Sequence, residues 1–154
     1  MGLSALGLAA ALAALVLALP APPARRGERA AGAVRAAGIT PAERDRENPV
    51  RASPRALAAG RTLWRIHCET CHGTAGKGDG PNARLHERRR GHAPRDLTDP
   101  DLQENLTDGE IFWRLSNGII EGENIIMPSF EKKISSETAR WQLVIFVREL
   151  GRAR

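Results

Sequence analysis

Aromatic side chains are scarce in this chain of 154 residues, which has no tyrosine, three phenylalanines and three tryptophans. The foldable part is also short, because one end is uniformly apolar and the next segment is rich in Arg, Ala and Glu without an apolar period. About 100 residues remain, which is small for a domain with one hydrophobic core. Such a core needs a further source of buried apolar volume.

Cysteine is rare as well, since Cys68 and Cys71 are the two in the chain. Two cysteines three positions apart cannot form the long-range disulfide framework that stabilises many small exported domains. The pair must therefore bridge to itself, bind a metal or attach a covalent cofactor.

Charged residues are absent from the first 24 positions, and the run from Gly2 to Leu19 is almost wholly small and aliphatic. It predicts a signal peptide or signal anchor at 1–24, because about 18 apolar residues lie at the lower limit for a membrane span. Basic residues follow this run instead of preceding it, which favours a cytoplasmic domain. A start codon that omits a basic N-region would explain this. We expect export, to the periplasm or to the outer face of a bacterial cytoplasmic membrane, and leave cleavage open.

The charge of the remaining chain changes sign along its length. Residues 25–95 contain 16 Lys and Arg against seven Asp and Glu, whereas residues 96–124 contain one Arg against eight acidic residues. We expect a polarised surface that suits oriented docking better than uniform binding of a polyanion. Residues 25–52 lack an apolar period and predict a flexible linker, and residues 53–151 predict the folded domain.

Capping residues and apolar spacing predict three helices. The first starts after Ser53 and runs towards Cys68, the second follows the capping box Thr107–Glu110 and ends near Gly118, and the third runs from Ser135 or Ser136 to Gly151. No alternating strand pattern is present, so residues 73–106 and 118–134 are expected to be loops. The predicted fold class is all-α, a small domain with three to four helices and long loops around a bound group.

The sequence Cys68-Glu69-Thr70-Cys71-His72 has the spacing of a c-type haem attachment motif. Two thiols on one turn can reach the two vinyl groups at one edge of a porphyrin, and the adjacent histidine can bind the iron. A dithiol redox motif would need a neighbouring βαβ pattern, which is missing, and a surface disulfide is the simplest alternative. We therefore predict one covalent haem c with His72 as an iron ligand.

Zinc is a further interpretation of these cysteines, because fourteen residues separate Cys71 from His86 and five separate His86 from His92. The run Arg88–Arg90 would then suit nucleic acid. Against this, residues 73–81 contain glycines and a proline that would break the helix of a zinc finger. We expect haem and no nucleic-acid partner.

The second iron ligand is expected to be Met127, the one methionine besides the initiator. It precedes Pro128 in a predicted loop, where proline restricts the backbone. The alternative ligands are His67, His86 and His92. The first of these adjoins the motif too closely to cross the ring, and the other two lie in an Arg-rich segment.

These features resemble the class I cytochromes c, small exported electron carriers with His and Met iron ligands, over residues 48–150. In that family, a glycine and an aromatic residue on the first helix pack crosswise against an aliphatic and an aromatic residue on the last. Gly60 and Trp64, and Leu143 and Phe146, stand where the family has these residues. The resemblance implies a cytochrome c domain at 53–151.

Two segments resemble a bacterial subgroup of monohaem cytochromes more narrowly. They are Gly-Lys-Gly-Asp-Gly-Pro at 76–81 and Met-Pro-Ser-Phe at 127–130. This resemblance implies that the carbonyl of Pro81 accepts a hydrogen bond from Nδ1 of His72 and orients the imidazole. The Arg-rich stretch 84–95 departs from the subgroup.

With His72 and Met127 both on the iron, the expected function is transfer of one electron between redox proteins. Such a carrier is not itself an enzyme, although it can be the haem subunit of a larger complex. The alternative is a haem-based small-ligand sensor or a peroxidatic haem protein in which Met127 is a loose ligand. The arginines of 84–95 could pair with haem propionates, face an acidic partner or be solvated.

Overall fold

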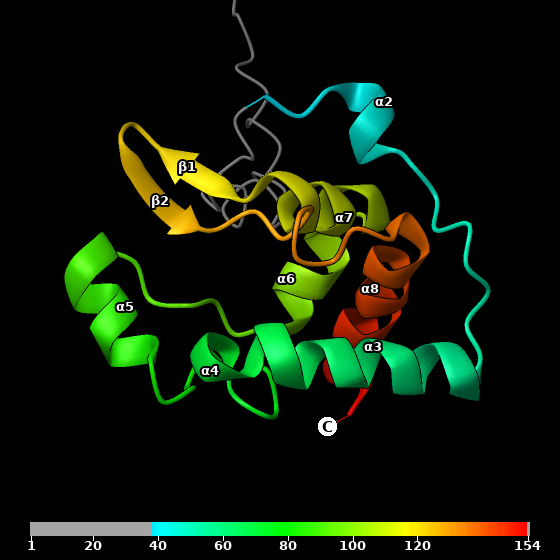
Figure 1. Cartoon of the computed structure of the whole chain (residues 1–154), viewed down its shortest axis with the longest axis horizontal. Coiled ribbons are helices and arrows are strands. Elements are labelled where there is room, and N and C mark those ends of the chain that lie inside the picture. The colour runs from blue at the N-terminus through cyan, green and yellow to red at the C-terminus, as the bar shows by residue number, and fades with distance from the viewer. Residues whose placement is uncertain (1–37, 154) are drawn as a thin grey trace, which may run out of the picture.

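The computed structural model describes residues 38–153 (Figure 1). The predicted signal peptide or anchor at 1–24 and the first part of the predicted linker lie outside these residues. Within residues 38–153, no helix is both long and apolar enough to cross a membrane.

The three predicted helices are present where they were expected. They are α3, Pro54–His67, α7, Asp108–Asn117, and α8, Glu137–Arg152. Each follows a hydroxyl side chain that accepts a hydrogen bond from a backbone N–H of the first turn: Ser53 from Ala56, Thr107 from Glu110 and Ser136 from Ala139. These starts could be predicted because a cap acts within three residues of itself.

The region 73–106, predicted to be a loop, contains two further helices. α5 spans Ala83–Arg90, α6 spans Pro100–Asn105, and the single-turn α4, Glu69–His72, precedes them. α5 has no apolar stripe, but Ala, Leu, Arg and Glu are all good helix formers. It ends at Gly91, whose left-handed conformation is common at a helix C-terminus.

The expected absence of strands is wrong at one place. β1, Ile119–Glu121, pairs antiparallel with β2, Asn124–Met127, so that Ile120 lies opposite Ile125. Strands of three and four residues are too short to produce a recognisable alternation of apolar and polar residues. The hairpin lies beside α5 at one end of an otherwise helical molecule (Figure 1), so the predicted helical framework is confirmed with this addition.

The core forms where α3 crosses α8 (Figure 1). Gly60 lies at this crossing. A Cβ at position 60 would collide with the carbonyl group of Gln142 and lie 2.9 Å from Cβ of Phe146. The rings of Trp64 and Phe146 are 5.6 Å apart, and Leu143 is completely buried. The predicted crosswise packing of these residues is therefore confirmed.

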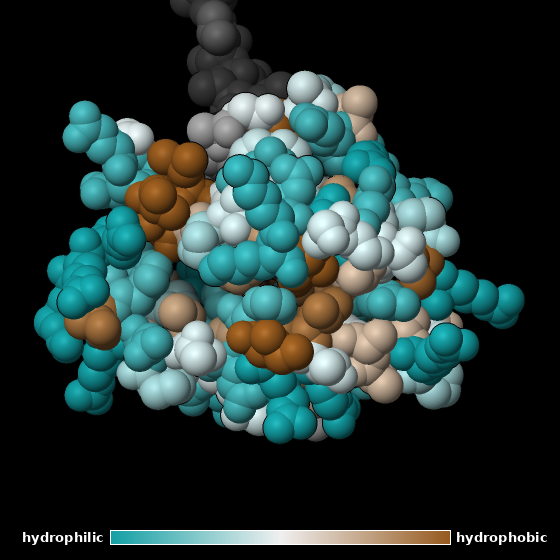
Figure 2. All heavy atoms as spheres, viewed as in Figure 1, coloured by the Kyte–Doolittle hydropathy of each residue, from teal (hydrophilic) through white to brown (hydrophobic). Residues whose placement is uncertain are grey.

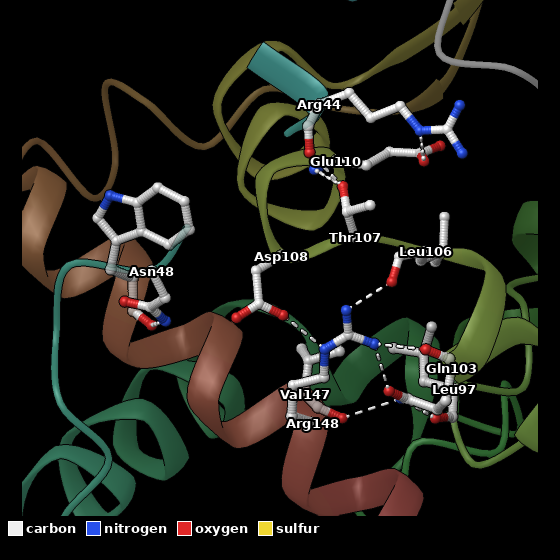
Figure 3. A network of polar contacts seen from close by, with 11 residues as sticks. Arg44, Asn48, Leu97, Gln103, Leu106, Thr107, Asp108, Glu110, Val147 and Arg148 are labelled. Carbon is white, nitrogen blue, oxygen red and sulfur yellow. Dashed lines mark hydrogen bonds and ion pairs between the residues drawn. The ribbon is translucent and has the colours of Figure 1, made fainter. Parts of the chain in front are cut away.

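Arg148 of α8 connects three segments through its guanidinium group (Figure 3). Its acceptors are Oδ1 of Asp108 at 2.7 Å, the carbonyl oxygen and Oε1 of Gln103 at 2.7 and 3.0 Å, and the carbonyl oxygen of Leu106 at 2.5 Å. Gln103 also donates from Nε2 to the carbonyl oxygen of Leu97 at 2.6 Å. Because the acceptors lie in α6, at its end and at the start of α7, one side chain positions these segments on α8.

The second part of the predicted linker packs on the domain. α2, Pro41–Arg44, lies against α7. Nη2 of Arg46 is 2.6 Å from Oε1 of Glu137, and Nδ2 of Asn48 donates to the carbonyl oxygen of Trp141 at 3.1 Å. Residues 41–48 are therefore attached to α7 and α8 largely through polar groups, which produce no apolar period in the sequence.

Candidate functional site

Cys68, Cys71 and His72 come together around the single turn of α4. The backbone N–H groups of Cys71 and His72 both donate to the carbonyl oxygen of Cys68, at 3.1 and 2.9 Å. Both thiols are free, with Cys68 buried and Cys71 half-buried. Burial, together with the neighbouring Cys71 thiol, raises the pKa of Cys68 to about 12. One turn thus presents a protonated thiol, a second thiol and an imidazole.

The loop that follows His72 holds the backbone of this turn. Three of its N–H groups donate to carbonyl oxygens of the motif: Gly78 to His72 at 2.9 Å, Gly80 to Cys71 at 3.2 Å and Asn82 to Thr70 at 2.8 Å. A Cβ on Gly80 would lie only 2.6 Å from the carbonyl oxygens of Glu69 and Thr70. Glycine is therefore required here so that the two backbones can approach each other.

His72 has the chemistry of a metal ligand. Burial lowers the pKa of its imidazole, so the ring is mainly neutral at neutral pH, which is the form that binds metals. Its Nδ1 lies 3.4 Å from the carbonyl oxygen of Arg95, a long contact. When Nδ1 carries the proton, Nε2 has the lone pair that can bind a metal.

The resemblance implied the carbonyl of Pro81 as the acceptor for Nδ1 of His72, and that assignment stays a prediction. Pro81 is exposed and lines a groove on the outer side of α4. The N–H of Leu97 donates to the carbonyl oxygen of Gly76 at 2.7 Å, which brings the neighbouring Arg95 beside the histidine. Every residue type has a carbonyl group, so the sequence contains no signal for Arg95.

Trp64 on α3 supports the motif from the side of the core. Its Nε1 donates to the carbonyl oxygen of Gly73, the residue after His72, at 3.2 Å. The rings of Trp64 and His72 are 5.8 Å apart and inclined by 46°. Trp64 therefore connects the α3–α8 crossing to the site, a role that its predicted packing did not include.

Met127 is the last residue of β2 and is half-buried against the core. The segment after it is attached to α7. The N–H of Phe130 donates to the carbonyl oxygen of Leu115 at 2.9 Å, and the hydroxyl of Ser129 donates to the carbonyl oxygen of Ser116. The methionine expected in a loop is thus held between a hairpin on one side and α7 on the other.

The other three histidines each have a partner elsewhere. The ring of His67 lies edge-on to a core phenylalanine, with centroids 6.0 Å apart. Nε2 of His86 is 2.6 Å from the carbonyl oxygen of Ile126, and its Nδ1 is 3.0 Å from that of His92. Nε2 of His92 is 2.8 Å from Oε2 of Glu121. His86 and His92 therefore attach α5 and the residues after it to the hairpin.

The zinc site and the dithiol redox motif that were considered as alternatives for the two cysteines are not formed in residues 38–153. No group of three or more His, Cys, Asp or Glu side chains in residues 38–153 is placed to hold a metal ion, so Cys68, Cys71, His86 and His92 do not form a zinc site. The sheet in the same part of the chain is one antiparallel hairpin. The βαβ context of a dithiol redox motif is therefore missing from it.

The surroundings of the motif match the chemistry of a haem site. α5 contacts both α4, which ends at His72, and β2, which ends at Met127. Two apolar side chains of the hairpin, Ile120 and Ile125, are 56% and 46% exposed, and Figure 2 shows a brown patch over the hairpin next to α5. Thiols, an imidazole, a thioether and apolar surface are the groups that bind a c-type haem.

Comparisons with known proteins agree with this chemistry. Residues 55–147 match the family described as cytochrome c oxidase, cbb3-type, subunit III. The chain is similar to one in the Kuenenia stuttgartiensis reducing HAO-like protein complex Kustc0457/Kustc0458, at 27% identity and a TM-score of 0.52, over 66% of this chain and 46% of that one. The KustC0563 c-type cytochrome has 25% identity and a TM-score of 0.48, over 59% of this chain and 95% of its own. No curated protein sequence matches the chain.

Proposed function

Because the chain belongs to the family of cytochrome c oxidase, cbb3-type, subunit III, whose domain is a c-type cytochrome, we propose that Cys68 and Cys71 bind its haem and that His72 is an iron ligand. The family establishes a covalent haem c and electron transfer, and the helical fold is that of a small cytochrome c. The observation that carries the residue assignment is the single turn that presents two free thiols and an imidazole.

Met127 is proposed as the second residue that would bind the iron. Its backbone is held on both sides, and β2 contacts α5, which in turn contacts α4. His86 and His92 are already engaged by carbonyl and carboxylate oxygens, so they are poorer candidates. A thioether ligand favours Fe(II) and therefore a higher reduction potential.

The protein residues have positioning roles in this proposal. The loop 73–82 holds the carbonyl groups of the motif, Trp64 holds Gly73, and the carbonyl of Arg95 orients His72 through Nδ1. When bound, the haem supplies a one-electron Fe(III)/Fe(II) couple. If His72 and Met127 both bind the iron, a substrate would find no free coordination site, which favours a carrier over an enzyme.

The cellular location and the redox partners are also part of the proposal. We infer that the electron passes between redox proteins on the extracytoplasmic side, with the chain free, tethered by residues 2–19 or part of a larger complex. The similar Kuenenia chain belongs to a protein complex, and this chain covers about half of its length. The cytochrome c domain remains 53–151, with residues 41–48 attached to it, and its loop 76–81 resembles the bacterial monohaem subgroup.

The visible spectrum of a Met127→Ala variant tests the second axial ligand. We expect the weak red absorption band of a ferric haem with Met ligation in the unsubstituted protein, and its loss together with a lower reduction potential in the variant. His92→Gln is the control, because this histidine pairs with Glu121, and it should retain the band. An unchanged spectrum in Met127→Ala would show that another group binds the iron. Equally rapid CO binding by both proteins would indicate a ligand-binding haem protein instead of a carrier.

A haem-stained denaturing gel tests the attachment itself. Full-length protein from a host with haem-attachment machinery should retain the stain, and a Cys68→Ala, Cys71→Ala double variant should lose it. A protein that is unstained despite normal expression would overturn the assignment.

A further inference from the structure

The outer face of α5 is strongly basic. Arg84, Leu85, Arg88 and Arg89 are all exposed, and their spacing places them on one side of the helix. Ala83 and His86 occupy the opposite side, where Ala83 is buried and His86 contacts the hairpin. We define the four exposed residues as the α5 face.

The guanidinium groups of the α5 face make no ion pair or hydrogen bond with any of residues 38–153. Other arginines are used inside the fold, since Arg46 and Arg148 pair with carboxylates and Arg140 donates to backbone carbonyl groups. Arg88 and Arg89 lie in the last turn of α5, where positive charge is favourable, but guanidinium groups this close together on one short helix also repel each other. Their positive charge is therefore available for an external partner.

The position of the α5 face links it to the redox site. α5 is the element that contacts both α4 and β2, which carry the proposed iron ligands His72 and Met127. His86 holds it against the hairpin, with Nε2 2.6 Å from the carbonyl oxygen of Ile126. Figure 2 shows teal surface over α5 with brown surface over the hairpin beside it. A molecule bound at the α5 face would thus be separated by this one helix from the elements that carry the proposed iron ligands.

We propose that the α5 face is a docking surface for an acidic protein, an inference that rests on the proposed electron-transfer function and names the kind of redox partner. Guanidinium groups bind carboxylates bidentately and lose less hydration than ammonium groups, so arginine suits a protein interface. A membrane surface fits less well, because insertion requires a broad apolar face and Leu85 is the one large apolar residue of α5. The nearby exposed Ile120 and Ile125 supply apolar contact area at the edge of this interface.

Binding of poly-L-glutamate, measured by titration calorimetry at low ionic strength on the full-length haem protein, tests the proposal. The triple variant Arg84→Gln, Arg88→Gln, Arg89→Gln should bind at least about tenfold more weakly, as expected for the loss of three exposed charge pairs. The matched control removes the same charge from exposed, unpaired residues elsewhere: Arg51→Gln, Arg55→Gln, Lys132→Gln. It should bind within about threefold of the unsubstituted protein if net charge alone has a minor effect.

Three results would overturn the docking surface. The first is an equal loss of affinity in the triple variant and the control. The second is binding to phosphatidylglycerol vesicles without binding to poly-L-glutamate. The third is loss of haem stain in the triple variant alone, which would show that these arginines are needed for attachment of the haem. Calorimetric binding does not depend on electron transfer. A protein that binds poly-L-glutamate at the α5 face but lacks haem would therefore refute the proposed function and not the surface.

Discussion

Gly60 and Gly80 act on this fold in the same way, by leaving space where two backbones meet. Gly60 allows α3 to approach the backbone of α8, and Gly80 allows the loop after His72 to approach α4. In both cases an added Cβ would meet backbone atoms, which cannot move aside as the end of a flexible side chain can. The first contact determines how closely α3 and α8 pack in the core, and the second determines how closely the loop packs on the turn that carries the cysteines.

Substituting Gly60→Ala tests the close crossing of the helices. Alanine is the better helix former by about 1 kcal/mol, so an unconstrained helix would gain stability. At the crossing, the new Cβ must push α3 away from Gln142 and Phe146. We expect the free energy of unfolding to fall by about 1–3 kcal/mol, measured by urea denaturation of the haem protein.

Ala58→Gly on the exposed side of α3 is the control for helix propensity. It should cost about 1 kcal/mol without any effect on packing. A Gly60→Ala protein as stable as the unsubstituted one would contradict the crossing geometry.

Among the elements, α8 and α5 form for different reasons. α8 buries a continuous face, on which Trp141, Leu143 and Val144 are completely inaccessible, so tertiary packing stabilises it. α5 buries little and consists of residues with good helix propensity. The apolar stripe made α8 predictable, whereas a helix without such a stripe looks like a charged loop.

Arg148→Met tests how α8 holds α6 and α7. The variant removes bonds from the guanidinium to Asp108, Gln103 and Leu106, while the methylene part of the side chain can still pack. Hydrogen bonds to charged groups contribute about 1.5–3 kcal/mol, and we expect a loss of about 2–3 kcal/mol in the free energy of unfolding.

Arg152→Met, in the same helix, is the matched control for Arg148. Its ion pair with Glu149 is 3.6 Å long, and its side chain is 70% exposed. Exposed pairs contribute little, so the change should stay within about 0.5 kcal/mol. Similar losses in the two variants would mean that the network does not hold these elements together.

At the scale of the whole molecule, the fold decides which charges are neutralised. Asp108 and Glu110 belong to the acidic stretch 96–124, and they pair with Arg148 and Arg114. The arginines of α5 have no such partners in residues 38–153. The fold therefore leaves the positive charge of α5 without a partner in these residues. Around α7 and α8, ion pairs neutralise part of the negative charge.

The contact between Arg46 and Glu137 joins the N-terminal segment to α8 and predicts a pH effect. The hydrogen bond from Arg46 holds the pKa of the Glu137 carboxyl below its usual value of 4.5. Because the folded-state pKa is the lower one, the carboxylate adds stability above the unfolded pKa and loses this contribution as the pH falls through the folded value. The two side chains are 44% and 55% exposed, so the effect is small.

Glu137→Gln should therefore be less stable than the unsubstituted protein at about pH 7, and the difference should narrow below about pH 4. Urea unfolding midpoints at both pH values measure it. A difference that is constant over this range would show that the carboxylate makes no charge-dependent contact.

The sequence by itself determined the features that depend on neighbours within a few residues. The three N-caps act within their own first turns, and Cys68, Cys71 and His72 share one turn because of their spacing. The packing of Gly60 and Trp64 against Leu143 and Phe146 was expected from the resemblance to the class I cytochromes c, and a glycine inside a helix fitted it because such a glycine indicates a close approach. Met127 was identifiable as a candidate ligand, and its role stays a proposal.

Only the tertiary structure decided what depends on distant contacts. The hairpin ends at Met127 and is attached to α5 through His86, the carbonyl of Arg95 lies beside His72, and residues 41–48 pack on α7 and α8. Each of these contacts uses a backbone carbonyl or an exposed polar group, and such groups leave no periodic trace in a sequence. Which groups meet depends on the path of the chain through space. The crossing of α3 and α8 is the most extensive contact along that path.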